Sequence, residues 1–418
     1  PFFGSAYLGF SAPAGGFQSD PGILSDPFTA AGAVNPFPSK PVDHSVNFAA
    51  AGDLPIGGGN PFFIDPNLKT PYIYQFNLSL QQQLVNNLTL EVGYVGYVAH
   101  GLTGLTDINP FVPGSGTRVL DQQACCAGDY NFMNTFENIG MANYNALQTT
   151  LTKRMSSSRF GETFFTFAYT WSHEIDNESG YRQRNDFVPY FDHEQFRASG
   201  DFDLRNVISL SGGWELPFDK LWEKGPSRLT KGWNLYPIVS YRSGFPLDVM
   251  AFPGVEPSQT SPGPSGAGDP QVVRADLVAP VTYYDPHGYQ TIQSATAGAQ
   301  TGNYYFNPNS FSNARAVALN NQLLSGVDPS TLVSSFTYGT LGRNILRGPG
   351  SFNFDVALSK HLKLFSEKLD AEFRVDAFNL FNHAEFSNPD TNIGDPSFGQ
   401  ISTTADPRIL QVALHLRF

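Results

Sequence analysis

Hydrophobic and polar residues alternate one by one in several separate stretches of this chain. The clearest stretch is 410–418, where every even-numbered residue is apolar and the odd-numbered ones are Gln, Ala, His and Arg. A period of two predicts a β-strand with one apolar and one polar face. Leu414, Leu416 and the terminal Phe418 lie on its apolar face. The rival interpretation of this segment is the edge strand of a soluble sandwich.

The same alternation recurs in eight stretches upstream, which brings the number of predicted strands to nine. Their polar faces carry mostly Ser, Thr, Asn, Gln and charged residues, and Glu372, Arg374 and Asp376 share one of these faces. A soluble sandwich would expose such residues to bulk water, whereas a wide barrel would point them into a wet lumen. Alternation alone leaves both alternatives open. The predicted strands span about 72–84, 88–97, 143–154, 162–173, 204–216, 231–243, 351–361, 369–381 and 408–418.

The connections between these strands alternate in length. Four are short or of intermediate length (85–87, 155–161, 217–231 and 362–368), and four are long (98–142, 174–203, 244–350 and 382–407). An up-and-down membrane barrel has tight periplasmic turns and long extracellular loops, whereas a Greek-key sandwich has no reason to keep this order. The sequence therefore predicts an all-β, antiparallel, up-and-down transmembrane β-barrel whose C-terminus lies at the periplasmic end.

The odd strand number changes this prediction in one respect. Bacterial single-chain barrels have even strand numbers, so at least one strand is expected before the first one recognised. We therefore expect residues 1–70 to be an extracellular loop region and residues 71–418 to be the C-terminal part of a larger barrel. A sheet that does not close should show an open edge.

Composition agrees with this class of protein and excludes others. Aromatic residues make up 14% of the 418 residues, charged residues 15%, and the formal net charge is −12. An acidic chain argues against a nucleic-acid partner. No apolar run approaches the roughly 20 residues of a transmembrane helix, and the mean hydropathy is −0.22. Because only every second residue of a barrel strand faces lipid, neither observation excludes a barrel.

Candidate chemistry is sparse. We find no zinc-protease helix, nucleophile elbow, phosphate loop or complete calcium loop, so we expect no enzyme and no cofactor. Adjacent Cys125 and Cys126 are compatible with a strained disulfide or with two free thiols.

Four aromatic residues near strand ends suit membrane-interface girdles, with ordinary strand packing as the alternative. These four are Trp171, Trp214, Trp233 and Tyr241. A polar cluster could bind a cation at an extracellular rim, although a solvated loop is the simpler interpretation. Its members are His173, Glu174, Asp176, Asp192, His193 and Glu194.

Several motifs, taken in order, resemble the Oar-like TonB-dependent receptors over residues 70–418. The resembling segments are TPYIYQFNLSLQ (70–81), LEVGYVG (90–96), YNALQ (144–148), YTWSH (169–173), GWNL (232–235), YRSGFP (241–246), EFRVDAFNLFNH (372–383) and the ending at Phe418. The resemblance implies an outer-membrane barrel of about 22 strands. It also implies an N-terminal plug and a TonB box, neither of which is present in this sequence.

The resemblance further implies how the protein works and which partners it meets. Uptake of an unidentified substrate would be driven by the TonB complex, acting through the missing N-terminal part. The barrel would contact outer-membrane lipid, and the C-terminal Leu414, Leu416 and Phe418 would be read by the barrel-assembly machinery. Two alternatives remain. One is a surface protein of the same fold that acts in adhesion or secretion, and the other is a soluble all-β binding or carbohydrate-active protein.

Overall fold

A computed structural model describes eight ranges of the chain and two single residues between them. These are 62–109, 119, 134–158, 160–179, 194, 196–249, 275–294, 298–314, 340–364 and 369–417, with residue 195 omitted. Several residues named in the predictions lie outside the described residues. They are 1–61 of the predicted N-terminal loop region, Cys125, Cys126, Asp192, His193 and Phe418.

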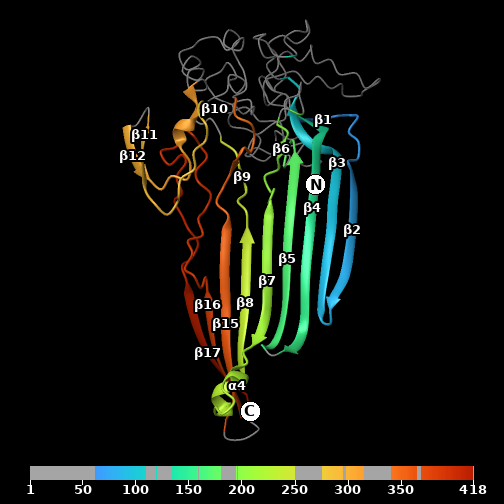
Figure 1. Cartoon of the computed structure of the whole chain (residues 1–418). Coiled ribbons are helices and arrows are strands. Elements are labelled where there is room, and N and C mark those ends of the chain that lie inside the picture. Colours follow the sequence, from blue (N-terminus) through green and yellow to red (C-terminus); the bar gives the residue numbers. More distant parts are fainter. Residues whose placement is uncertain are drawn as a thin grey trace, which may run out of the picture.

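All nine predicted strands are present, and they form one antiparallel meander (Figure 1). Each strand pairs with the one before and after it in this series, in the order β2-β3-β4-β5-β7-β8-β15-β16-β17. The prediction of an all-β, up-and-down architecture is confirmed. The strands are β2 (Tyr72–Val85), β3 (Leu88–Asp107), β4 (Asn134–Ser158), β5 (Gly161–Asp176), β7 (Asn206–Glu215), β8 (Trp233–Arg242), β15 (Ser351–Leu364), β16 (Leu369–Phe378) and β17 (Ile409–Arg417).

The strand register gathers the apolar residues on one face of the whole sheet. One row of directly opposed residues begins with Gln82 on β2 and is apolar on the next six strands: Leu90, Leu151, Phe167, Leu210, Val239 and Phe354. A neighbouring row crosses seven strands and is almost entirely polar: Gln81, Glu91, Thr150, Ala168, Ser209, Ser240 and Asn353. Because neighbouring residues of a strand point to opposite faces, the sheet has an apolar face and a polar face.

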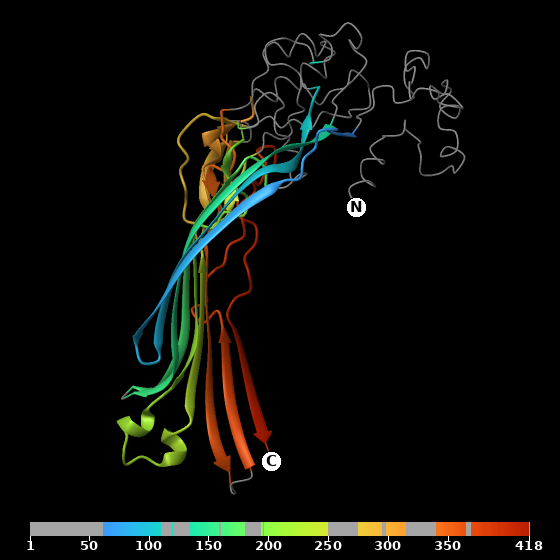
Figure 2. The same ribbon diagram turned by 90° about the vertical axis from the view of Figure 1, so that its right-hand side faces the viewer.

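The described sheet is curved and open at both ends. Figure 2 shows it from the side, with β2 nearest the viewer and β15, β16 and β17 behind. Among the described strands, β2 pairs only with β3, and β17 pairs only with β16. An open edge was expected from the odd strand number. The large apolar side chains of these two strands are exposed, for example Leu80 at 70% and Val412 at 63%.

Short turns lie at one end of the strands and long connections at the other (Figure 1). At the turn end, β2 and β3 are joined by two residues, and Asn87 takes a φ of 68°. Asparagine tolerates this left-handed conformation, which tight hairpin turns require. Arg417 pairs with Asp370 at the start of β16, so β17 ends at the turn end. The predicted alternation of short and long connections is confirmed.

The predicted boundaries are wrong mainly for β3 and β4, which are longer than the alternation indicated. Both continue into the predicted loop 98–142, where the register shifts between His100 and Leu102 and again between Leu102 and Gly104. Such bulges put extra residues into one strand and break the period of two, so the pattern no longer signals a strand. β16 stops before its predicted end because Asn379 takes a φ of 50°.

The connections contain short elements that the sequence did not indicate. At the turn end, the connection between β7 and β8 forms two single-turn helices, and no described helix is long and apolar enough to cross a membrane. At the loop end, β1 pairs in parallel with β4, and β6 pairs with β5. The short elements are α4 (Phe218–Leu221), α5 (Ser227–Thr230), β1 (Phe62–Ile64), β6 (Ala198–Ser199), β9 (Pro246–Leu247), β10 (Asp276–Leu277), β11 (Gln290–Ser294), β12 (Gly298–Gly302), η4 (Pro308–Ser310), β13 (Phe311–Ser312) and β14 (Leu346–Arg347).

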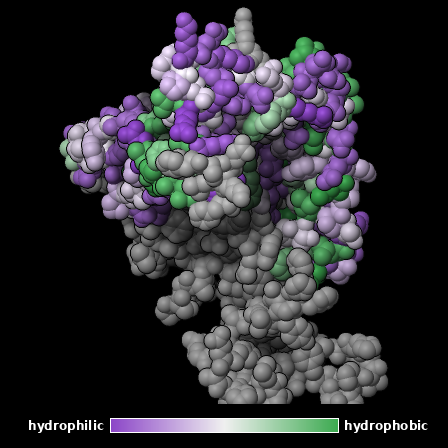
Figure 3. Space-filling view, turned by 90° about the horizontal axis from the view of Figure 1, so that it is seen from below, coloured by the Kyte–Doolittle hydropathy of each residue, from purple (hydrophilic) through white to green (hydrophobic). Residues whose placement is uncertain are grey.

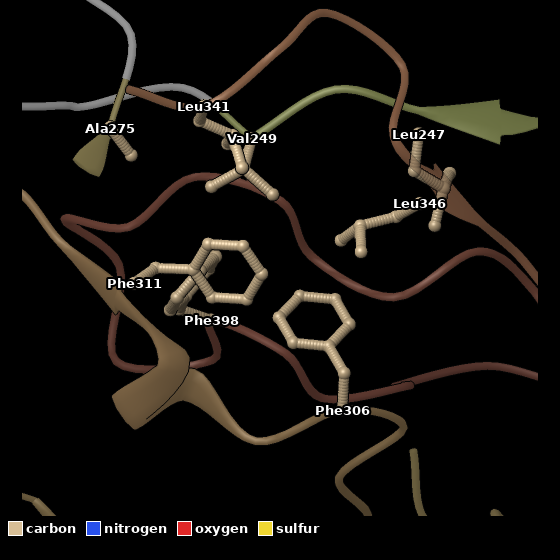
Figure 4. Packing of buried hydrophobic residues seen from close by; sticks show 8 residues of the cluster. All are labelled: Leu247, Val249, Ala275, Phe306, Phe311, Leu341, Leu346 and Phe398. Atoms are coloured by element: carbon tan, nitrogen blue, oxygen red, sulfur yellow. The ribbon is translucent and has the colours of Figure 1, made fainter. Parts of the chain in front are cut away.

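The described part of the connections 243–350 and 379–408 packs together into a unit that we call the loop cap. Its centre is a buried hydrophobic cluster (Figure 4) of Leu247, Val249, Ala275, Phe306, Phe311, Leu341, Leu346 and Phe398. The rings of Phe306, Phe311 and Phe398 meet edge to face, with centroids 5.4–5.7 Å apart. This is a favoured aromatic geometry. The cluster joins two loops that are distant in sequence.

Candidate functional site

The loop end of β5 carries acidic side chains that meet two arginines from the loop cap. Glu174 and Asp176 alternate with Ile175, so both lie on the polar face of the sheet. Glu174 accepts a hydrogen bond of 2.8 Å from the Tyr97 hydroxyl of β3. Asp176 is only 3% exposed. A buried carboxylate needs compensating partners, and the arginines supply them.

Arg343 is the main partner of Asp176. Its Nη1 donates to Asp176 Oδ1 at 2.6 Å, and both side chains are 4% exposed. Its Nη2 donates to Ser179 Oγ at 2.6 Å and contacts Asp201 Oδ1 at 3.3 Å. The next residue, Asn344, donates from Nδ2 to the same Asp201 oxygen at 2.7 Å. One short segment of the loop cap is therefore tied to the end of β5 and to the loop that follows it.

Arg347, four residues after Arg343, connects the loop cap to the same region a second time. It pairs with Asp203, whose side chain is fully buried and also receives Arg205 Nε at 3.0 Å. Burial alone would raise the pKa of Asp203, but hydrogen bonds from Arg347 and from the backbone N–H of Glu174 hold it below its usual range. A carboxylate that accepts several hydrogen bonds is stabilised in its charged form. Asp203 is thus ionised when the loop cap is in place.

Close backbone approach supports this second tie. The carbonyl of Gly244 accepts a hydrogen bond from Arg347 Nη1 at 3.4 Å. A Cβ atom at Gly244 would lie 1.7 Å from the carbonyl oxygen of Gly348. Only glycine allows the two chain segments to pass at this distance. The segment that enters the loop cap from β8 and the segment that leaves it toward β15 are thereby held side by side.

The polar cluster considered as a possible cation site contacts other protein side chains instead, as far as its residues are described. Asp176 pairs with Arg343, Glu174 with Tyr97, and His173 Nδ1 lies 3.3 Å from Asp203 Oδ2. Within the described ranges, no group of three or more His, Cys, Asp or Glu side chains is arranged to hold a metal ion. The alternative of a solvated loop is wrong for Asp176, because this residue is buried. The cluster neutralises charge and fixes the loop cap on the polar face.

Sequence reasoning missed Arg343 and Arg347. They lie 167 and 144 residues from their acidic partners, and nothing local connects the two segments. A weak signal exists in the sequence: two arginines four residues apart stand just before the predicted strand at 351, in a stretch rich in Gly. That signal identifies neither the partners nor the burial.

The four predicted interface aromatics lie on the apolar face at two heights. Trp214 and Trp233 are at the turn end, where their Nε1 atoms donate to the carbonyls of Phe160 and Leu229 at 2.6 and 2.7 Å. Trp171 and Tyr241 lie toward the loop end, 52% and 36% exposed. In the strand register, Trp214 on β7 is directly opposite Thr163 on β5, which is eight residues before Trp171. At about 3.3 Å per residue, the two levels are about 26 Å apart along the strand.

The predicted charges of β16 share its polar face. Arg374 Nε donates to both carboxylate oxygens of Asp376, at 2.9 and 3.1 Å, while Glu372 lies between two histidines. On β17, Leu414 and Leu416 lie on the apolar face, 62% and 48% exposed. The recognition of Leu414 and Leu416 by the assembly machinery stays a prediction. The position of Glu372, Arg374 and Asp376 in a lumen also stays a prediction.

Comparison with solved structures finds outer-membrane receptors and transporters. The transporter YddB from Escherichia coli aligns over 86% of this chain with 12% identity and a TM-score of 0.39. BauA, the ferric preacinetobactin receptor from Acinetobacter baumannii, aligns over 83% with 10% identity and a TM-score of 0.35. The ferripyoverdine receptor of Pseudomonas aeruginosa aligns over 83% with 8% identity and a TM-score of 0.35. This chain spans 34%, 29% and 27% of their respective lengths.

Comparison of the sequence with known proteins and protein families identifies a family. No curated protein matches it significantly. One family model matches residues 3–411, which is nearly the whole chain, and it describes an outer membrane beta barrel domain. The amphipathic meander, with turns at one end and long loops at the other, has the form that such a domain requires. The chain belongs to the outer membrane beta barrel domain family and lies in the outer membrane of the cell.

Proposed function

We propose that this domain is the C-terminal part of the barrel of an Oar-like TonB-dependent transporter, which takes up an unidentified substrate across the outer membrane. The observation that carries the proposal is the open nine-stranded meander, whose terminal strands β2 and β17 each pair on one side only. Within lipid every ladder group needs a partner, so these edges must meet further strands. A barrel that adds strands to these nine is wide enough to enclose a lumen and a plug.

The two faces of the sheet support this interpretation. The apolar face meets lipid, and the polar face lines the lumen, where Glu372, Arg374 and Asp376 lie. Trp171 and Tyr241 form part of the outer aromatic girdle, and Trp214 and Trp233 part of the inner one. At a strand tilt of about 40°, their separation corresponds to about 20 Å along the membrane normal, close to the apolar band of about 25 Å in such barrels.

The proposal includes an orientation of the molecule in the membrane. Residues 1–70 and the loop cap are extracellular, and residues 71–418 form the barrel with its turns in the periplasm. Leu414, Leu416 and Phe418 then lie at the periplasmic end, where the barrel-assembly machinery would read them. The loop cap, fixed by Arg343 and Arg347, frames the extracellular mouth through which a substrate enters.

The proposal is tested on the full-length protein. We expect it to show heat-modifiable migration in outer-membrane fractions and to capture the periplasmic domain of TonB through a segment that precedes the barrel. Deletion of that segment should abolish capture and leave heat-modifiable migration unchanged. Surface display of a folded barrel without TonB capture would overturn uptake and favour a role in adhesion or secretion. Recovery in the soluble periplasm would overturn both.

A further inference from the structure

A cavity of about 630 Å³ opens at the turn end of the sheet, and we call it the turn-end pocket. It lies where β15, β16 and β17 continue past the start of β8, because Trp233 already pairs with Lys360 and leaves 361–364 beyond it. The neighbouring connection with α5 forms its other wall. Its lining residues include Arg228, Lys231, His361, Lys363, Asp370, Glu372, His415 and Arg417.

The strand register arranges charges in the pocket so that each acid has a base on either side. Asp370 on β16 is directly opposite Lys363 on β15 and Arg417 on β17. Two residues further along the same face, Glu372 is directly opposite His361 and His415. Directly opposed residues of opposite charge attract one another. The two acids of β16 therefore hold four basic side chains in two parallel rows.

In the row of Glu372, the side chains of the opposed residues also contact one another. His361 Nε2 lies 3.6 Å from Glu372 Oε1, and His415 Nδ1 lies 3.5 Å from Glu372 Oε2. The Glu372 side chain is 17% exposed, while the two histidine side chains are 49% and 55% exposed. The carboxylate thus lies beneath the imidazoles, which are the groups presented to the pocket.

The connection with α5 shifts the charge balance further. It contributes Arg228 and Lys231, both exposed, from outside the sheet. Four Arg and Lys side chains of the lining face two carboxylates, so the lining has an excess of positive charge. Figure 3 looks onto this end of the molecule, and hydrophilic residues occupy much of its coloured surface. Concave sites with converging positive charges attract anions.

We propose that the turn-end pocket binds a small anion that carries two or more phosphate or carboxylate groups. Its volume lies in the range of small-molecule sites, about 300–1,000 Å³. Arginine forks suit phosphate and carboxylate oxygens, and lysine adds point charges. The two walls supply cations from opposite sides, which a ligand with several anionic groups can bridge. This site does not depend on whether the domain transports a substrate.

The test measures binding of two probes, inorganic pyrophosphate and citrate, to the purified full-length protein in detergent by calorimetry. We expect saturable binding of at least one probe. The substitutions Arg228→Gln and Lys231→Gln together should weaken it about tenfold, since each exposed charge contributes modestly. The matched control, Lys220→Gln with Lys224→Gln, removes two positive charges from the same connection outside the pocket lining and should change affinity less than about twofold.

A substitution that removes a negative charge from the pocket lining distinguishes a defined binding site from nonspecific electrostatic attraction. Glu372→Gln removes a negative charge from the lining and should tighten binding, by about threefold. Heat-modifiable migration of each variant verifies that the barrel is folded. Tighter binding of pyrophosphate would assign phosphate as the ligand chemistry, and tighter binding of citrate would assign carboxylate. Absence of saturable binding to the wild-type protein, or equal weakening in the control variant, would overturn the proposal.

Discussion

The sheet and the loop cap use the same kinds of residues in opposite ways. On the sheet, Phe373 is 45% exposed on the apolar face, and its neighbour Arg374 pairs with Asp376 on the polar face. In the loop cap, Phe306 is fully buried among other phenylalanines, and Arg343 is buried with its acid. The difference follows from the solvent. The sheet is built for lipid on one face, whereas the loop cap folds in water and needs its own core.

This comparison predicts the largest effects for substitutions of buried residues in the loop cap, and Arg343→Ala is the first of them. The change would leave the buried Asp176 carboxylate without its ion-pair partner, which costs about 3–5 kcal/mol. We expect faster hydrogen exchange in the loop cap and at the loop end of β5, with no change at the turn end. The matched control is Arg408→Ala in the same loop cap, because Arg408 is exposed. Equal exchange in both variants would contradict the role assigned to the buried pair.

The second prediction compares two phenylalanine substitutions. Phe306→Ala should destabilise the loop cap by about 3–5 kcal/mol, because it removes a buried ring and leaves a cavity. Phe373→Ala should cost about 2 kcal/mol or less, since lipid fills the space and only the transfer of the ring is lost. Protease sensitivity of the loops measures the first variant, and urea unfolding in lipid measures the second. A larger effect at Phe373 would reverse the comparison.

The third prediction examines the two faces of the sheet with neighbouring residues of β7. Leu210→Lys would place a charge on the lipid side and should cost about 2–4 kcal/mol if it lies near the midplane. Ser209→Lys would place the same charge on the polar face and should cost far less. Urea unfolding of both variants in lipid vesicles gives the comparison. Equal destabilisation would mean that the polar face does not line a wet lumen.

The smallest effect is expected from acid. The pKa of Asp203 is lower in the folded protein than in the unfolded chain, so its contribution to stability is present at neutral pH. That contribution is lost as the pH falls below the ordinary Asp value of about 3.9 and through the folded value. Hydrogen exchange at 196–205 and 340–349, corrected for the intrinsic pH dependence of amide exchange, should therefore accelerate as the pH falls below about 4. In Asp203→Asn this acceleration should diminish, and an unchanged response would assign it to another group.

Much of the fold could be read from the sequence because a strand in lipid obeys a local rule. Each of the nine strands needs one apolar face, so a period of two appears in the sequence wherever the strand is regular. The rule failed where the register shifts near Leu102, since a bulge breaks the period. It also failed in the loop cap, where short elements such as β9 and β14 pair across about a hundred residues and leave no periodic signal.

The candidate site was predicted only in part, and for a related reason. Glu174 and Asp176 could be recognised as a polar group at a strand end. Their partner Arg343 could not, because an ion pair between distant segments depends on how the loops fold.

The sequence by itself determined the nine strands of the meander, their antiparallel order and the alternation of turns and loops, since these depend on residues that are close together in the chain. The tertiary structure decided which carboxylates are buried with arginines and which lie between histidines. It also aligned the apolar residues of separate strands into continuous rows. Those outcomes depend on register and long-range packing, which bring together residues that carry no local sign of one another.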